Sequence, residues 1–440
     1  MEYWKKVTFL LSLYMFLFEI RPLETYLTSY LTGPNGNVSL SEVANTMTSI
    51  RSYTALMAAV IMFCISEYFF KSAIIVFTIF SFITYVLLTG TPSLTQLRVS
   101  MVGIGATSHT FVLGYSYLFS QIDDTKLYQS ATSIISFSLL FGIFVGSILA
   151  QIITSTSQGV YSALPYCNAF AMFLALICAC LFPVKMHHYY LTDNFLNENS
   201  KLLRNGLKTI KEFDGETIII DRFKKKNTVE IVLDKLFLDF KTSFANTTVI
   251  KRSLWYMVSM GTHFQIINNM NVLYSYIISR PGNNDVLMNG DADALINLCG
   301  ALGAYLIGRM KLDWTYHGDT FIAFCTTITG VLMASCYFYN HLISIYLTYV
   351  MYSLVCQMAF TINLSEIAKH LKNNCFSIVL GFNLIGALLV SSSLMLFFVQ
   401  INFLDITIPG RFLFIGGMNI SLGVVFWFLS YSSIHQRNTL

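Results

Sequence analysis

The sequence predicts an all-α integral membrane protein in which twelve transmembrane helices form two six-helix halves, and three observations support this fold class. Of its 440 residues, 55% are hydrophobic and only 11% are charged, whereas soluble globular chains carry about 25% charged residues. Apolar segments of about 20 residues, the length that spans a bilayer, recur along the chain. One extended polar tract, at residues 185–248, separates six of these segments from the other six.

The twelve predicted spans follow one another in chain order. They are 7–31, 42–66, 70–90, 96–121, 127–154 and 160–184 before the polar tract, and 249–278, 285–309, 318–338, 342–370, 374–400 and 409–433 after it. We therefore expect an N-terminal six-helix half at 1–184, a cytoplasmic linker at 185–248, a C-terminal six-helix half at 249–433 and a cytoplasmic tail at 434–440.

The distribution of positive charge predicts that both termini are cytoplasmic. With an even number of spans, the two termini lie on the same side of the membrane. Placing them in the cytoplasm puts all but five of the 27 lysines and arginines on that side, in agreement with the positive-inside rule. The five exceptions lie within spans or near the opposite face, and they are Arg21, Arg51, Arg98, Arg280 and Arg411.

The same topology places the loop at 33–41 on the outer face. This loop contains Asn37-Val38-Ser39, an N-glycosylation sequon, so we expect a glycoprotein modified at Asn37. The outer sequon and the lack of a targeting tail favour the plasma membrane. Lys5-Lys6 and the apolar run that follows imitate a secretory signal peptide, but no small-residue cleavage site follows them, so we expect an uncleaved first helix.

Enzyme and metal signatures are missing from the sequence. It has no Walker loop and no His-Glu-x-x-His motif. The nine cysteines lie almost entirely inside apolar segments, where cysteine is usually a small buried hydrophobe. The net charge of +4 is modest and gives no indication of a nucleic-acid partner. We therefore expect a protein that is not an enzyme and that uses neither a metal nor a cofactor.

Charged residues inside the spans are the first candidates for a binding site, because a charge at membrane depth costs about 3 kcal/mol. Arg21 and Glu24 lie three apart in the first span, so on one helix they share a face and neutralise each other. We expect Arg21 to be a structural charge. Pro22 opens the helix beside Glu24, which favours Glu24 as a residue that lines a site. Arg51, in the second span, is expected to be the main partner of Glu24.

Two aspartates and one glutamate lie in the C-terminal half. Asp291 and Asp293 have alternate spacing, which sends them to different helix faces, and Asp293 lies deeper in its span and is the better cavity acid. Glu366 lies near a cytoplasmic end, where its side chain is expected to reach the membrane surface.

Uncharged candidates complete the predicted site. Tyr115 and Tyr117 lie in the fourth span, and aromatic residues there either pack or contact a solute. Asn268 and Asn269 interrupt the seventh span, and buried amides indicate hydrogen bonding to something in the cavity. His109 is either a packing residue or a proton-sensitive group.

At these residues the sequence resembles the reduced folate carrier and thiamine transporter family of vitamin carriers. The matching segments are Arg21-Pro22-x-Glu24-x-Tyr26-Leu27, Tyr30-Leu31-x-Gly33-Pro34, Ser52-Tyr53, Tyr128-Gln129, Gly146-Ser147-x-Leu149-x-Gln151, Ser253-Leu254-Trp255, Asn289-Gly290-x-Ala292-Asp293-Ala294, Lys311-x-x-Trp314 and Gly381-Phe382-Asn383. The resemblance implies a major-facilitator-type fold with a central site for folates or thiamine, and two halves that rock about that site.

The chain departs from both substrate types at the positions that face the site. Folate carriers place basic residues where this chain has Phe111, Ser136, Ser353 and Ser391, which argues against high-affinity folate transport because a buried dianion needs cationic partners. Thiamine carriers have a second carboxylate at the position where this chain has Phe111, and aromatic residues where it has Gly114 and Arg51. The chain therefore retains Glu24 and Asp293 of the family motifs, but the resemblance does not identify the substrate.

We expect a secondary active transporter of a vitamin-like organic solute in the lipid bilayer, driven by a coupling proton or a counter-anion. The expected substrate-binding residues are Glu24, Arg51, Tyr115, Tyr117, Asn268, Asn269 and Asp293. The alternative is a transport-inactive membrane scaffold or receptor that retains the carrier fold, which the loss of cavity charges would also explain.

Overall fold

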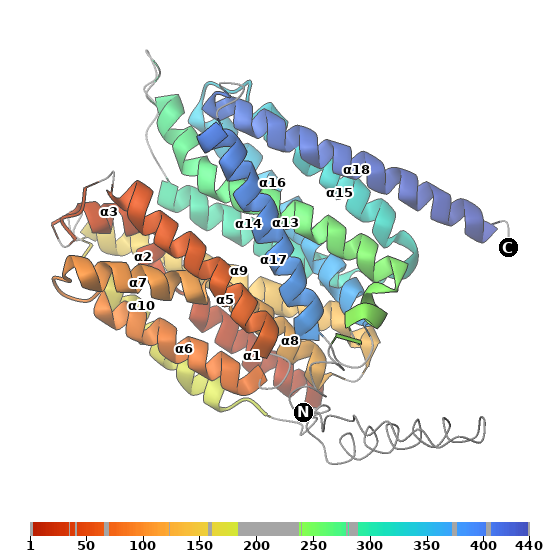
Figure 1. The fold of residues 1–440 in the computed structure, drawn as a ribbon, viewed down its shortest axis with the longest axis horizontal. Coiled ribbons are helices and arrows are strands. Elements are labelled where there is room, and N and C mark those ends of the chain that lie inside the picture. The colour runs from red at the N-terminus through yellow and green to blue at the C-terminus, as the bar shows by residue number, and fades with distance from the viewer. Residues whose placement is uncertain are drawn as a thin grey trace, which may run out of the picture.

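The computed structural model consists of long helices arranged as two adjoining bundles, and every regular element in the described part of the chain is helical (Figure 1). The structure describes residues 3–34, 36–39, 42–65, 70–122, 124–156, 161–183, 237–238, 240–278, 280, 289–371, 376–401 and 406–438. Most of the predicted linker at 185–248 lies outside these ranges, so the predicted domain boundaries stay a prediction.

The N-terminal bundle runs from α1 to α10. Its elements are α1 (Tyr3–Glu19), α2 (Pro22–Thr25), α3 (Leu27–Thr32), η1 (Val43–Met47), α5 (Thr48–Ile65), α6 (Phe70–Leu87), α7 (Leu94–Thr107), α8 (Phe111–Gln121), η2 (Thr125–Leu127), α9 (Tyr128–Thr156) and α10 (Leu164–Cys180). The C-terminal bundle consists of α13 (Thr247–Ile278), α14 (Asn289–Arg309), α15 (Trp314–Ser335), α16 (Leu342–His370), α17 (Phe376–Met395), η4 (Leu396–Ile401) and α18 (Ile408–Asn438).

Each of the twelve predicted spans coincides with one to three consecutive helices. Within the described residues, six helices are by length and composition apolar enough to cross a bilayer on their own, and two shorter apolar helices lie at Ser49–Met62 and Leu164–Cys180. The all-α prediction is confirmed.

Two predicted spans are interrupted helices; the opening at Pro22 was predicted from the sequence, and the interruption before Phe111 was not. The segment 7–31 is split into α1, α2 and α3, and the segment 96–121 is split into α7 and α8. Pro22 begins α2 because proline lacks an amide hydrogen and fits the first turn of a helix but not its interior. Arg21 and Glu24 therefore do not share the face of one continuous helix. At the second interruption, the Ser108 hydroxyl donates to the carbonyl oxygen of Ile104 at 2.7 Å. This bond gives a partner to a carbonyl group in the last turn of α7, where the helix ends.

The two bundles share apolar packing at one end of the molecule. Leu364 and Ile367, near the end of α16, and Phe376 and Leu380, near the start of α17, are buried in the same core as the N-terminal bundle. The ring centroids of Phe376 and Phe119 are 5.6 Å apart. The second core consists only of C-terminal residues. Since α16 ends and α17 begins on the side predicted to be cytoplasmic, apolar side chains close the bundles together on that side.

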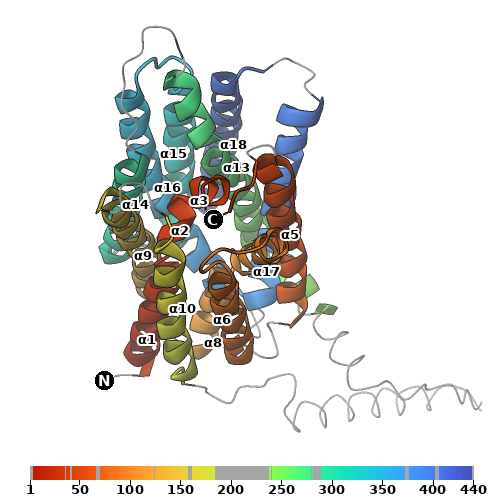
Figure 2. The same cartoon turned by 90° about the vertical axis from the view of Figure 1, so that its left-hand side faces the viewer.

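Helices α9 and α14 form a second contact between the bundles, and they lie side by side (Figures 1 and 2). The Gln129 side-chain amide donates to the carbonyl oxygen of Ile307 at 2.8 Å. A Cβ atom added at Gly308 would lie 1.8 Å from the Ser133 hydroxyl and 2.3 Å from its Cβ. Since the Ser133 Cβ is fixed to the backbone, only glycine lets α14 approach α9 this closely.

Helix α13 holds the C-terminal bundle together through hydrogen bonds to four neighbouring helices. The pairs are Trp255 with Thr326 of α15 at 2.9 Å, Thr262 with Asn419 of α18 at 3.1 Å, His263 with Tyr352 of α16 at 3.0 Å, and Gln265 with the Ser391 carbonyl of α17 at 2.7 Å. Each such bond contributes about 0.6 kcal/mol to stability inside a membrane. Together the four bonds fix the orientation of four helices around α13.

The close approach of α14 to α9 yields a stability prediction. We expect Gly308→Ala to lower the thermal unfolding temperature of the purified protein, because overpacking a tight contact costs about 1–3 kcal/mol. Gly417→Ala is the matched control, since a Cβ at that helical glycine meets no atom within 4 Å. Equal unfolding temperatures for the two variants would contradict the proposed contact.

Candidate functional site

A compact cluster of four charges surrounds the break between α1 and α2. The Arg21 guanidinium forms an ion pair with Glu19 and donates to Glu24 Oε1 at 2.9 Å. The Tyr85 hydroxyl donates to the same Glu24 oxygen at 2.8 Å. Arg51 Nη2 lies 3.5 Å from the other carboxylate oxygen of Glu24. Two arginines thus balance two glutamates at membrane depth.

This cluster contains both predicted partners of Glu24 and adds Tyr85, which the sequence did not indicate. Arg51 does pair with Glu24 across helices, but Arg21 and Tyr85 lie closer to its carboxylate. Sequence reasoning also missed Glu19. This glutamate lies inside the first predicted span, near Arg21, and its side chain is buried. With 39% of its side chain exposed, Arg51 is the most accessible of the four charged side chains.

Asp293 lies on α14 in the opposite bundle and has a different environment. Its side chain is half-buried, and within the described residues its carboxylate has no hydrogen bond or ion pair. The phenols of Tyr26, Tyr274 and Tyr349 lie within electrostatic range of it. Asp291 is exposed, so the two aspartates face different sides as their spacing predicts.

Two of the segments that resemble the carrier family, the one around Glu24 and the one around Asp293, meet at Gln151 of α9. The Tyr26 hydroxyl donates to Gln151 Oε1 at 2.6 Å. A Cβ atom added at Gly290 would lie 2.3 Å from the same Gln151 oxygen and 3.1 Å from the Tyr26 hydroxyl. The start of α14 therefore packs against the segment that follows Glu24. This contact brings Asp293 to the boundary between the two bundles, and the charge cluster lies beside the same boundary.

The predicted amides and tyrosines have contacts of their own. Asn268 is exposed, whereas Asn269 accepts a hydrogen bond from Arg411 at 2.9 Å. Tyr115 shares a hydrogen bond of 2.6 Å with the Ser136 hydroxyl. Tyr117 donates to the Pro183 carbonyl oxygen at 2.5 Å and lies at the end of α8 away from the break in its span.

The uncharged positions expected from the resemblance are occupied by packing or hydrogen-bonded side chains. Phe111 is half-buried, and its ring contacts both Tyr115 and His109 edge-on. Gln265 donates to the Ser391 hydroxyl at 3.1 Å. His109 lies in the break between α7 and α8, its Nδ1 atom is buried without a hydrogen-bond partner, and its ring centroid is 5.3 Å from that of Phe264 in the other bundle.

A second charge cluster lies at the start of α13 and was missed in the sequence. Arg252 is 2% exposed and pairs with Asp319 at 2.8 Å. Glu366, which was expected to reach the membrane surface, is instead 1% exposed and accepts from Lys369 at 2.6 Å. The expectation that the Glu366 side chain reaches the membrane surface is therefore wrong. The signal in the sequence was that Arg252 and Asp319 lie within predicted spans, where an unpaired charge is costly.

Comparisons with known proteins support the resemblance over nearly the whole chain. A sequence model described as the reduced folate carrier matches residues 2–414. Folate transporter 1 of Caenorhabditis elegans is 24% identical over 99% of this chain and 94% of its own length. Human thiamine transporter 1 is also 24% identical, over 97% of this chain and 89% of its own.

Solved structures support the fold. The crystal structure of the human organic anion transporter MFSD10 (TETRAN) superposes with a TM-score of 0.64 at 11% identity and covers 97% of this chain and 100% of its own. The major facilitator superfamily proton:xylose symporter XylE has a TM-score of 0.58 at 16% identity, covering 97% of this chain and 95% of its own. The chain is therefore a multi-pass membrane protein with the major facilitator fold, and it belongs to the reduced folate carrier family of transporters, not to a family of enzymes.

Proposed function

We propose that this chain is a secondary active transporter of a small vitamin-like organic solute that carries a cationic group and binds between the two bundles. The observation that carries the proposal is Asp293, a half-buried carboxylate without a hydrogen bond or ion pair in the described residues. A carboxylate in such surroundings is stabilised by a cationic ligand. The phenols of Tyr26, Tyr274 and Tyr349 lie within electrostatic range of this carboxylate, and aromatic rings near a site favour a cationic ligand.

Glu24 has a different proposed role because its charge is already balanced. Arg21, Arg51 and Tyr85 surround its carboxylate. In our proposal Glu24 holds Arg51 at the edge of the site, and Arg51 contacts an electron-rich or anionic part of the solute. Arg51 is the more exposed of the two arginines beside Glu24, and one arginine is too little for a folate dianion, which favours a solute with one negative group at most.

The other candidates support the site to different degrees. Asn268 is exposed and free to contact a solute. Asn269 and Tyr115 contribute indirectly, since Asn269 holds Arg411 and Tyr115 bonds to Ser136. Tyr117 packs against the segment after α10 and is assigned to stability.

The names of the relatives support a vitamin-like solute, since they are described as folate and thiamine transporters. A proton or a counter-anion would drive uptake as the bundles rock about the site. We further propose a plasma-membrane location with both termini in the cytoplasm. A transport-inactive scaffold or receptor is the alternative, favoured by the uncharged residues at Phe111, Ser136, Ser353 and Ser391.

The proposed role of Asp293 is tested by uptake into cells. We expect Asp293→Asn to lower uptake of a cationic vitamin such as thiamine by at least about tenfold, because losing a charge-assisted contact costs about 1.5–3 kcal/mol. Asp291→Asn is the matched control, since Asp291 is two residues away and exposed. Uptake that is equal in Asp293→Asn and in the original chain would refute the site, and no accumulation of thiamine, folate or pyridoxine above empty vector would favour the scaffold.

The proposed role of Arg51 predicts a change in ligand preference. Arg51→Gln leaves Glu24 with one fewer cationic partner, so thiamine should stabilise the purified variant more than it stabilises the original protein, while folate should stabilise it less. Thermal-shift measurements with each ligand check this without requiring transport. Arg98→Gln serves as control, because Arg98 pairs with Glu42 at 2.7 Å, away from the cluster. An unchanged order of ligands would argue against a role for Arg51.

The predicted orientation is tested by the two sequons. Asn37 is exposed and has a φ of 50°, and we expect it to carry a glycan that peptide N-glycosidase F removes, with a mobility shift that Asn37→Gln abolishes. Asn246 begins a second sequon on the side predicted to be cytoplasmic, so Asn246→Gln should leave the shift unchanged. A glycan on Asn246 would reverse the proposed topology.

A further inference from the structure

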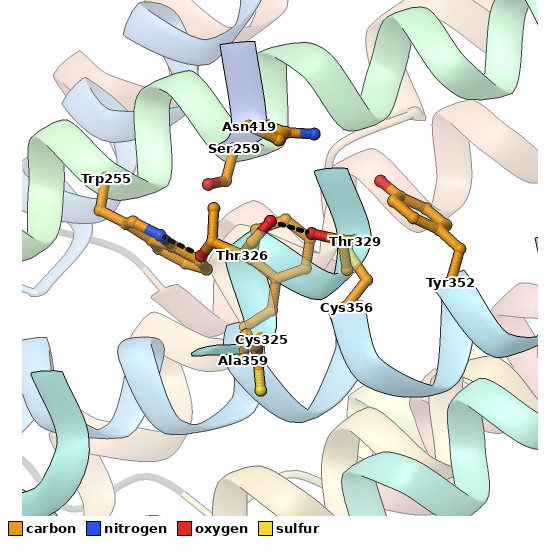
Figure 3. A pocket seen from close by; sticks show the side chains of 10 residues that line it. Trp255, Ser259, Cys325, Thr326, Thr329, Tyr352, Cys356, Ala359 and Asn419 are labelled. Atoms are coloured by element: carbon orange, nitrogen blue, oxygen red, sulfur yellow. Dashed lines mark hydrogen bonds between the residues drawn. The ribbon is translucent and has the colours of Figure 1, made fainter. Parts of the chain in front are cut away.

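A small cavity lies inside the C-terminal bundle, between α13, α15, α16 and α18 (Figure 3). Its volume is about 10 Å³, close to the roughly 10–15 Å³ that one water molecule requires. All ten lining residues are buried. None of these ten is an acid, a lysine, an arginine or a histidine, so the cavity offers no charge to balance an ion.

Polar side chains from three helices project into this cavity. The Ser259 hydroxyl of α13 is buried and has no hydrogen-bond partner among the residues that the structure describes. The Thr329 hydroxyl of α15 donates to the Thr326 carbonyl oxygen at 2.9 Å, which leaves its oxygen free to accept. Asn419 of α18 accepts from Thr262 at 3.1 Å through its side-chain oxygen, and its amide group remains available as a donor. Figure 3 shows Ser259 and Asn419 entering from one side and Thr329 facing them.

We propose that this cavity binds one structural water molecule. The water would donate to Thr329 Oγ1, accept from the Asn419 amide, and share a hydrogen bond with the Ser259 hydroxyl. Buried waters typically make about three such bonds to groups that lack other partners. An empty cavity would leave the Ser259 hydroxyl desolvated and unpaired, which is costly in a membrane interior.

The proposed water extends the set of hydrogen bonds made by α13. It lies between the Trp255–Thr326 pair and the Thr262–Asn419 pair, so it would join α13 to α15 and α18 at an intermediate level. This site is separate from the proposed solute site and does not depend on the substrate.

Two serines on α13 provide a matched test. Ser253 and Ser259 are both buried, and neither hydroxyl has a hydrogen-bond partner, but only Ser259 lines the cavity. Removing an unpaired buried hydroxyl is neutral or stabilising, whereas removing a partner of a bound water is destabilising. We therefore expect Ser259→Ala to lower the unfolding temperature by about 2 °C and Ser253→Ala to leave it unchanged or to raise it.

An equal or higher unfolding temperature for Ser259→Ala would overturn the proposal, because it is the result that a dry cavity predicts. A density map at a resolution that shows ordered waters provides a second test on the unmodified protein. A peak within hydrogen-bond distance of Ser259, Thr329 and Asn419 would support the site. Clear density for these side chains with nothing between them would refute it.

Discussion

The ion pairs of Arg21 are the interaction on which the N-terminal bundle depends. Arg21 lies in the gap between α1 and α2 and joins Glu19 to Glu24. Each of these charges would cost about 3 kcal/mol if it faced lipid alone, so the three residues must stay together inside the bundle. The break at Pro22 makes this possible, because it turns the chain while the Leu23 amide donates to Asn168 of α10 at 3.0 Å.

The direction that α2 takes after the break determines the contact with the other bundle. Tyr26, at the end of α2, reaches Gln151 of α9, and Gly290 of α14 packs against both. The position of Asp293 follows from this contact, since it lies less than one helical turn after Gly290. The charge network in one bundle and the Asp293 carboxylate in the other are therefore connected through the hydrogen bond between Tyr26 and Gln151 and through the packing of Gly290.

The two bundles are stabilised in different ways. Around α1 and α2 the N-terminal bundle uses balanced charges, whereas the middle of the C-terminal bundle uses neutral hydrogen bonds from α13 to α15, α16, α17 and α18. The C-terminal bundle has its own charge cluster at the start of α13, where Arg252 pairs with Asp319. Asp293, which has no hydrogen bond or ion pair within the described residues, stands out against this pattern, and that contrast is why we propose it as the contact with a solute.

The sequence by itself determined the fold class, the approximate positions of the spans and the family, because composition, apolar length and the two charged motifs are local properties. It also singled out Glu24 and Asp293 as candidates, and their role stays a prediction. The helix break at Ser108, the contact of Tyr85 with Glu24, and the burial of Glu19 and Glu366 were decided only by the tertiary structure. The physical reason is that a charge inside a membrane is compensated by whichever helix packs beside it. Tyr85 reaches Glu24 from α6, and no spacing within one segment reveals such a partner.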